Sequence, residues 1–288
     1  MPIKRTAPRK VMAIHDLSCA GRCSLTVAIP ILSAAGITCC PLPTAVLSTH
    51  TGEFTGYTFH DLTEEMLPIV RHWQREHLRF CAVYSGYLGS PAQIGIVEEI
   101  FSFYRGKDCP VVVDPVMGDH GRLYTAYTPA MAEGMAKLCR QADCIIPNMT
   151  EAAFLTGRPY REGPYGEAEI ASLLEALGKL GPRDVVLTGV SFQPQHNGIA
   201  CYHRESGRID CFATPHVPGI FYGTGDVFAS VLVAALCSGR EITAAARMAM
   251  DFTYDCIVRT AAEDVDRRFG VDFESGLAEL GGRIRQDR

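Results

Sequence analysis

Short apolar runs alternate with longer amphipathic segments along most of the chain. The short runs are too apolar for surface helices and predict buried strands at residues 11–14, 38–42, 81–84, 111–113, 144–146 and 185–187. The longer segments repeat apolar residues at helical spacing and predict helices at 61–77, 91–104, 129–140 and 167–180. Such regular alternation predicts an α/β fold with a mostly parallel sheet and helices on both of its faces.

The last third of the chain departs from this alternation. Two apolar runs at residues 199–203 and 209–213 flank the turn sequence Glu205-Ser206-Gly207, which predicts an antiparallel hairpin at the sheet edge. Two long helices are predicted next, at 226–238 and 243–260. Because no repeat, low-complexity stretch or linker interrupts the pattern, we expect a single domain over residues 1–288, with residues 1–9 as a flexible tail.

Composition narrows the classes of function. The 288 residues are 47% hydrophobic and carry 27 Lys+Arg against 32 Asp+Glu, a formal net charge of -5, which disfavours a nucleic-acid partner because such proteins need a basic surface. A basic cluster at residues 4–10 precedes only a short apolar run, too short for a signal peptide or membrane span. We therefore expect a cytoplasmic protein with no membrane partner.

The chain contains twelve cysteines, a number that raises the question of disulfides or a metal site. It has no Cys-x-x-Cys pair and no accompanying His cluster, and most cysteines lie in or beside predicted strands. We expect reduced thiols that serve as small core residues.

The strongest local motif is Gly223-Thr224-Gly225-Asp226, which opens a strongly apolar helix. Two glycines allow a tight turn, so that the free amides at the helix start can bind an anion. Asp226 alone has a simpler interpretation as a helix N-cap, but that interpretation does not explain both glycines. The Walker A, dinucleotide, Gly-x-Ser-x-Gly and His-Glu-x-x-His motifs are all absent from the sequence.

An anion hole beside a carboxylate suits phosphoryl transfer to an alcohol. The amides of residues 223–225 would hold the charge of the transferring group, while Asp226 accepts the hydroxyl proton and orients the oxygen. Since aspartate is ordinarily a weak base, we expect orientation to be the larger part of its role. Such a reaction also needs a metal ion.

Candidate metal ligands follow two predicted strands. Asp114 and Asp119 come after the strand at 111–113, and Asn148 and Glu151 come after the strand at 144–146. These positions fall on the edge of a parallel sheet where ligands bind, and Mg²⁺ needs only one or two carboxylates besides phosphate oxygens. The alternatives are structural, because Asp-Pro is a common turn and Asn148 is a good helix cap.

At this point the chain resembles the pyridoxal/pyridoxamine kinases of the ribokinase-like superfamily, from about residue 10 to residue 274. The resemblance rests on the following motifs, which together are far more specific than any one: Ser85-Gly86-Tyr87-Leu88-Gly89-Ser90, Asp114-Pro115-Val116-Met117-Gly118, Pro147-Asn148 with Glu151, and Gly223-Thr224-Gly225-Asp226. It implies a three-layer α/β/α sandwich and ATP-dependent phosphorylation of the 5'-hydroxymethyl group of pyridoxal, pyridoxine or pyridoxamine. ATP and Mg²⁺ are the implied cofactors, and a monovalent cation is left open.

The resemblance also implies roles for individual residues. On the nucleotide side, Asp226 matches the catalytic aspartate and residues 223–225 (Gly223, Thr224 and Gly225) match the anion hole. The positions that match ATP-binding residues are Asp114, Asn148, Glu151 and Thr188, and the positions expected near the metal are Asp114, Asp119 and Glu151.

On the vitamin side, Thr51 matches a position that contacts the pyridine ring, and Tyr87 falls in the wall of the same pocket. Asp16 stands where many relatives carry serine. An acidic residue there would accept a hydrogen bond from the 3-hydroxyl group or attract the amine of pyridoxamine.

Two alternatives stay open at the level of sequence. Hydroxymethylpyrimidine (phosphate) kinases share the Gly-rich site with its aspartate, although residues 48–57 and 85–90 favour the pyridoxal side. A non-catalytic binder of pyridoxal compounds is the alternative of another class, and the intact motif at 223–226 argues against it. The resemblance further implies a homodimer.

Overall fold

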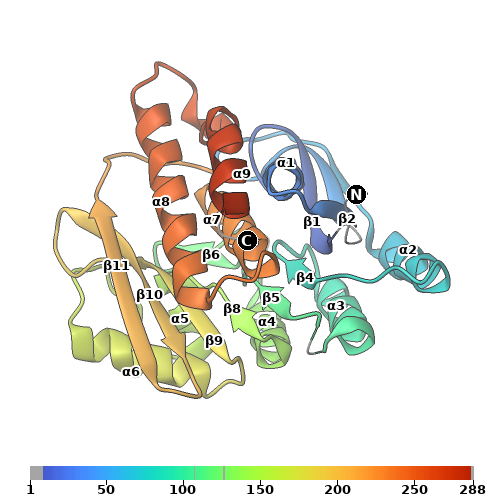
Figure 1. The fold of residues 1–288 in the computed structure, drawn as a ribbon, viewed down its shortest axis with the longest axis horizontal. Coiled ribbons are helices and arrows are strands. Elements are labelled where there is room, and N and C mark those ends of the chain that lie inside the picture. Colours follow the sequence, from blue (N-terminus) through green and yellow to red (C-terminus); the bar gives the residue numbers. More distant parts are fainter. Residues whose placement is uncertain (1–8, 107, 126, 287–288) are drawn as a thin grey trace, which may run out of the picture.

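One large sheet organises the molecule. The computed structural model describes residues 9–106, 108–125 and 127–286, and Figure 1 shows their arrangement. Within these residues nine strands form one sheet in the order β11-β10-β9-β8-β5-β4-β1-β2-β3. The strands are β1 (Lys10–Ala20), β2 (Thr38–Thr49), β3 (Phe59–Asp61), β4 (Ala82–Ser85), β5 (Val111–Val113), β8 (Cys144–Ile145), β9 (Asp184–Val190), β10 (His196–His203) and β11 (Arg208–Pro215).

The centre of the sheet is parallel and its two edges are antiparallel. Neighbouring strands pair in parallel from β2 through β1, β4, β5 and β8 to β9. The hairpin β10–β11 continues the sheet antiparallel on one side, and β3 pairs antiparallel with β2 on the other. The predicted edge hairpin is therefore confirmed.

Helices cover both faces of the sheet. One face packs against α1 (Leu25–Ala34), α7 (Thr224–Cys237), α8 (Ile242–Ala261) and α9 (Leu277–Gln286), and the other against α2 (Thr63–Arg75), α3 (Pro91–Tyr104), α4 (Pro129–Gln141), α5 (Met149–Thr156) and α6 (Glu167–Gly178). The sequence of β1 is continuously apolar because helices cover both of its faces. Val11 and Ala13 face the first helix layer, while Met12 and Ile14 face the second. The structure confirms the predicted α/β fold with a helix, sheet and helix layer.

The sequence pattern missed several elements. Helix α1 is almost entirely apolar, so it lacks the polar face that reveals a helical period. Strand β2 extends seven residues past the predicted run to Thr49, although Pro41 and Pro43 lie within it. The prolines are tolerated because β2 pairs there with β1 alone, and its other neighbour β3 begins to pair only at Ala45. Strand β3, the small hairpin β6 (Gly118–Asp119) and β7 (Arg122–Leu123), and helix α9 were also not predicted.

Of the predicted tail at residues 1–9, only Arg9 is described. Residues 1–8 of the predicted tail lie outside the described residues. Arg9 is held in place, since its carbonyl accepts a hydrogen bond from the Thr38 amide at 2.8 Å and its guanidinium donates to the Cys237 carbonyl. All twelve cysteines are described and none is joined in a disulfide; six are buried and four half-buried, but Cys19 and Cys211 are exposed and are not core residues as predicted. Among the described residues no helix is long and apolar enough to cross a membrane.

Candidate active site

The predicted site residues gather at one edge of the sheet. Asp114 directly follows β5, Asn148 follows β8, and Thr188 lies near the end of β9. Their strands are parallel neighbours, so their carboxyl ends meet at the edge where ligands bind in open α/β sheets. Helix α7 begins with residues 224–226, and the Asp226 carboxylate acts electrostatically on Asp114. The structure therefore brings the predicted anion hole to the strand-end residues.

The turn into α7 explains both glycines of the motif. Gly223 has a φ of 76°, and a β-carbon added there would lie 2.0 Å from the backbone oxygen of Arg22. Neither the conformation nor the contact tolerates a side chain. Gly225 is different, because a β-carbon there would meet no atom within 4 Å. Its open face leaves room for a ligand to approach the free amides at the start of the helix.

Asp226 is partly buried in the first turn of α7, and its carboxylate accepts a hydrogen bond from the backbone amide of Ser24. Burial raises its pKa from 3.8 to about 7, an effect that the Ser24 amide opposes and the nearby Asp16 carboxylate reinforces. An aspartate with this pKa is a much better proton acceptor than an ordinary one. With this pKa, base strength would add to the orienting role predicted for Asp226, and that role stays a prediction.

Asp16 lies close to Asp226 and is 5% exposed. The register of β1 against β2 shifts between His15 and Leu17, and such an irregularity re-aims the side chain within it. Its carboxylate accepts hydrogen bonds from the hydroxyl of Ser18 at 2.8 Å and from that of Ser24 at 2.5 Å. Burial raises the pKa of Asp16, while both hydroxyls lower it.

Ser24 is a site residue that the sequence did not reveal. Its hydroxyl donates to Asp16 and its backbone amide to Asp226, so it holds both acids at once. Ser24 is buried and has a φ of 56°, an uncommon conformation for a residue other than glycine. A single serine before an apolar segment has no distinctive pattern, so only the three-dimensional structure identifies its role.

The predicted vitamin-side residues lie near Asp16 to different degrees. Tyr87 is half-buried, and burial followed by the Asp16 charge raises its pKa to about 12, which indicates that its hydroxyl lies near Asp16. Thr51 is exposed in the loop after β2. The loop is anchored by its neighbour His50, whose Nδ1 accepts from the Gly52 amide at 3.0 Å and whose Nε2 contacts the Arg268 carbonyl at 2.5 Å.

Asp114 and Glu151 form the acidic part of the site. Both are buried, and burial is the first cause of the raised pKa of each carboxyl. The charges that act on Asp114 come from two further carboxylates, Glu151 and Asp226, and both raise its pKa further. Burial raises the pKa of Glu151 to about 7, an effect that the amides of Asn148 and Met117 oppose. Buried acids that repel one another in this way favour a cation between or beside them.

Asn148 and Glu151 also have a structural role. The Asn148 side chain accepts from the Glu151 amide at 2.9 Å, and Glu151 Oε2 accepts from the Asn148 amide at 2.8 Å, a complete capping box at the start of α5. Glu151 Oε1 accepts from the Met117 amide at 3.0 Å, and Asn148 Nδ2 donates to the Gly118 carbonyl at 2.9 Å. Asn148 therefore caps α5, as the structural alternative predicts, and the bonds to Met117 and Gly118 fix the loop that follows Asp114.

Thr188 lies beside Asn148, whereas the Asp119 side chain is largely exposed. The Thr188 amide donates to the Pro147 carbonyl at 2.9 Å, beside Asn148. Asp119 projects from the β6–β7 hairpin with a side chain that is 59% exposed, and it accepts from the His120 amide. Across residues 9–106, 108–125 and 127–286, no three His, Cys, Asp or Glu side chains are close enough to hold one metal ion. Asp119 is near enough to Glu151 for its charge to raise the pKa of that carboxyl, and the assignment of Asp114, Asp119 and Glu151 to the metal stays a prediction.

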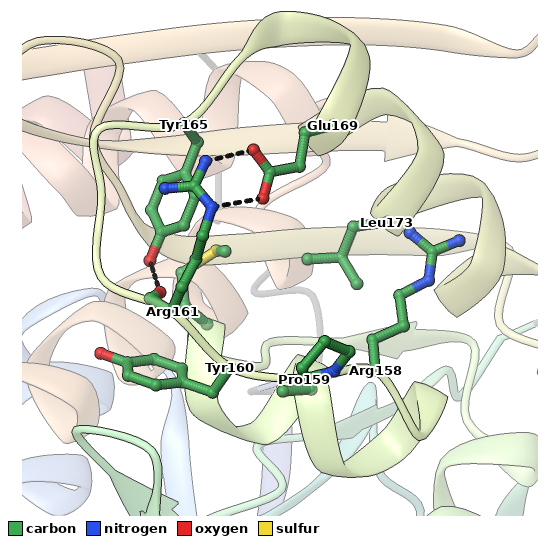
Figure 2. Close-up of a pocket in the computed structure, with 9 residues that line it drawn as sticks. Arg158, Pro159, Tyr160, Arg161, Tyr165, Glu169 and Leu173 are labelled. Atoms are coloured by element: carbon green, nitrogen blue, oxygen red, sulfur yellow. Dashed lines mark hydrogen bonds and ion pairs between the residues drawn. The ribbon is translucent and has the colours of Figure 1, made fainter.

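A separate surface pocket lies between α5 and α6 (Figure 2). In this pocket Arg161 pairs with Glu169, and the Tyr165 hydroxyl donates to the Arg161 carbonyl at 2.8 Å. None of the residues that line the pocket belongs to the predicted site. The chemistry described above therefore lies at the sheet edge and not in this pocket.

Comparison with known proteins agrees with this geometry. The family model described as phosphomethylpyrimidine kinase matches residues 29–269. A candidate phosphomethylpyrimidine kinase from Bacteroides thetaiotaomicron, solved with pyridoxal, is 40% identical with a TM-score of 0.90, covering 95% of this chain and 96% of that one. Pyridoxal kinase from Lactobacillus plantarum is 31% identical with a TM-score of 0.88, covering 96% and 98%.

A curated relative extends the same pattern. Pyridoxal kinase from Granulibacter bethesdensis is 27% identical over 264 residues, which cover 87% of this chain and 90% of that protein. The family model spans most of the chain, and the two solved structures match it over nearly their whole length. The chain therefore belongs to the phosphomethylpyrimidine and pyridoxal kinase family of the ribokinase-like superfamily.

Proposed function

We propose that this protein is an ATP-dependent pyridoxal kinase, which phosphorylates the 5'-hydroxymethyl group of pyridoxal, pyridoxine or pyridoxamine in vitamin B6 salvage. The observation that carries the proposal is the position of Asp226, which stands in the first turn of α7 beside the free amides of the anion hole. Pyridoxal in the structure of the Bacteroides relative, at 40% identity, supports the vitamin as substrate. Curated pyridoxal kinases among the relatives support the same substrate class.

The chain's own groups divide the reaction between them. The Ser24 amide holds the Asp226 carboxylate, which accepts the proton of the substrate hydroxyl as the oxygen attacks phosphorus. Residues 223–225 direct backbone amides at the negative charge that develops on the transferring phosphoryl group. Because the amides are fixed by the turn at Gly223, they need no rearrangement during the reaction.

Magnesium fits the acidic part of the site. Asp114 is buried beside Glu151 and Asp226, and within the described chain the charges that act on its pKa are carboxylates alone. Glu151 uses both carboxylate oxygens for backbone amides, so Asp114 is the better candidate for direct contact. Mg²⁺ binds through one or two carboxylates together with water and phosphate oxygens, and it would neutralise charge on the phosphates. Asn148 and Thr188 are proposed to border the nucleotide from the ends of β8 and β9.

The vitamin is proposed to bind beside Asp16. Tyr87 would form one wall of the pocket, and Thr51 would contact the ring from the loop that His50 anchors. The Asp16 carboxylate would accept a hydrogen bond from the 3-hydroxyl group of the vitamin or attract the amine of pyridoxamine.

One experiment separates this function from its alternatives. The purified protein is incubated with ATP and Mg²⁺ together with pyridoxal, pyridoxine, pyridoxamine or hydroxymethylpyrimidine, and ADP release is measured with a coupled assay. We expect the vitamers to give kcat/KM values at least tenfold above that for hydroxymethylpyrimidine. Preference for hydroxymethylpyrimidine would favour the pyrimidine kinases, and binding of the vitamers without ATP consumption would favour a non-catalytic carrier.

We also propose that the protein is a cytoplasmic homodimer. The support is the family to which the chain belongs together with the finding that the described residues contain no membrane-spanning helix. Light scattering coupled to size-exclusion chromatography would test the oligomeric state, with twice the mass of one chain as the expected result. Adding K⁺ or Na⁺ to the kinase assay would show whether a monovalent cation takes part.

A further inference from the structure

Two cysteines lie in contact at the end of the molecule opposite the site. The sulfur atoms of Cys81 and Cys237 are 3.1 Å apart, and both residues are partly exposed free thiols. Cys81 directly precedes β4, whose far end leads into the site, and Cys237 is the last residue of α7, whose first turn carries Asp226. The pair therefore joins the remote ends of two elements that build the active site, about 20 Å from it at the helical rise of 1.5 Å per residue.

The surroundings of the pair distinguish the two thiols. The hydrogen bond with Cys237 is the main cause that lowers the pKa of Cys81, and the charge of Arg9 lowers it further. The same hydrogen bond and burial raise the pKa of Cys237, which also stands at the negative end of the α7 dipole. Cys109 acts electrostatically on Cys237, and burial, followed by the charge of Cys81, raises the pKa of Cys109 itself to about 12. Reactive cysteines are typically partly exposed thiols beside a positive charge, which describes Cys81.

We propose that Cys81 and Cys237 are an oxidation site, a dithiol that hydrogen peroxide converts to an intramolecular disulfide. The Cys81 thiolate attacks one peroxide oxygen, so that an S–O bond forms, the O–O bond breaks and the leaving hydroxide takes a proton to become water. The Cys237 sulfur then attacks the Cys81 sulfur, an S–S bond forms, and hydroxide leaves with the Cys237 proton as a second water. Two thiols and one peroxide give one disulfide and two waters.

The geometry favours this product over further oxidation of a single thiol. A disulfide has sulfur atoms about 2.05 Å apart, so the pair must approach by only about 1 Å. A resolving thiol in contact captures the sulfenic acid before a second peroxide reaches it. Because the bond would link residues 81 and 237, it closes a long loop in the unfolded chain and is expected to stabilise the fold.

The experiment uses the purified, fully reduced protein and hydrogen peroxide as the probe. The protein is treated with a small molar excess of peroxide, remaining thiols are alkylated, and peptides are mapped by mass spectrometry without reduction. We expect one dominant cross-linked peptide pair that contains Cys81 and Cys237, with a loss of two hydrogen masses that dithiothreitol reverses. The oxidised protein should unfold at a temperature about 5 °C or more above that of the reduced protein.

Three variants sharpen the result. C81S and C237S should each abolish the cross-linked pair and the rise in unfolding temperature, whereas C39S, which removes another partly exposed thiol, should retain both. Alkylation of both Cys81 and Cys237 after peroxide treatment, sulfinic acid at Cys81, or a dominant cross-link to another cysteine would each overturn the proposal. The readouts are masses and unfolding temperatures, so they do not depend on the kinase activity.

Discussion

Replacement of Asp226 by asparagine changes catalysis and stability in opposite directions. Asparagine keeps an oxygen that can accept from the Ser24 amide, but it cannot accept the substrate proton. General-base catalysis typically contributes a factor of about 10² to 10⁴, so kcat of D226N should fall by that order. The backbone amides of the anion hole are unaffected, and the affinity for ATP should change little.

The effect on stability follows from the raised pKa. The folded protein holds the Asp226 proton more tightly than the unfolded chain does, so ionisation of Asp226 destabilises the fold. This cost is absent below pH 3.8, grows as the pH rises, and is complete above about pH 7. A rise in the Asp226 pKa from 3.8 to about 7 corresponds to at most about 4 kcal/mol of unfolding free energy. Solvent at this partly exposed side chain and the favourable α7 dipole reduce it, and we expect about 2 kcal/mol.

Chemical denaturation of the two proteins at pH 5 and pH 8 tests the reasoning without substrate. D226N should be more stable than the unmodified protein at pH 8, and the difference should shrink at pH 5. In the kinase assay, kcat/KM of the unmodified protein should rise with pH and level off above about pH 7, because the base must be ionised. Near-normal turnover by D226N would refute the catalytic assignment, and equal stability differences at the two pH values would refute the raised pKa.

Three further predictions concern the glycines, the vitamin pocket and the metal. G223A should lose several kcal/mol of stability because its β-carbon meets the Arg22 carbonyl, whereas G225A should fold normally and lose kcat; equal unfolding temperatures for the two would contradict the contact analysis. D16S should reduce the ratio of kcat/KM for pyridoxamine to that for pyridoxine about fivefold, and an unchanged ratio would remove the proposed role of the carboxylate. Chelation with EDTA should abolish turnover and excess Mg²⁺ should restore it. Turnover that persists after chelation would contradict the proposed requirement for a metal ion.

The sequence predicted the framework well because the buried strands and amphipathic helices have strong periodic signals. Helix α1 escaped prediction since it is almost entirely apolar, and the predicted strand ended at Leu42, whereas β2 continues past Pro43 to Thr49. In the structure both α1 and the full length of β2 depend on the elements beside them. Neighbouring elements, not local preference, decide whether an apolar segment is a helix and whether an edge tolerates proline.

The candidate site was predictable wherever a residue type and a strand end coincided. Asp114 has that signal at the end of β5, Asp226 has instead the signal of a glycine turn before a helix, and the structure brings the two acids together. Ser24 had no such signal because its role comes from a contact with Asp226, two hundred residues away in the chain. The exposure of Asp119 was not predictable, since proximity to Asp114 in sequence does not reveal that the β6–β7 hairpin leaves its side chain 59% exposed.

The central claim is that Asp226 and the turn before it transfer a phosphoryl group to a pyridoxal alcohol. The most direct measurement incubates the protein with ATP, Mg²⁺ and pyridoxal and quantifies ADP and the phosphorylated vitamin together by mass spectrometry. The account predicts one phosphorylated pyridoxal for each ADP with the unmodified protein, and a rate lower by about 10² or more with D226N. ADP formed without phosphorylated pyridoxal, or no ADP with any vitamer, would contradict it.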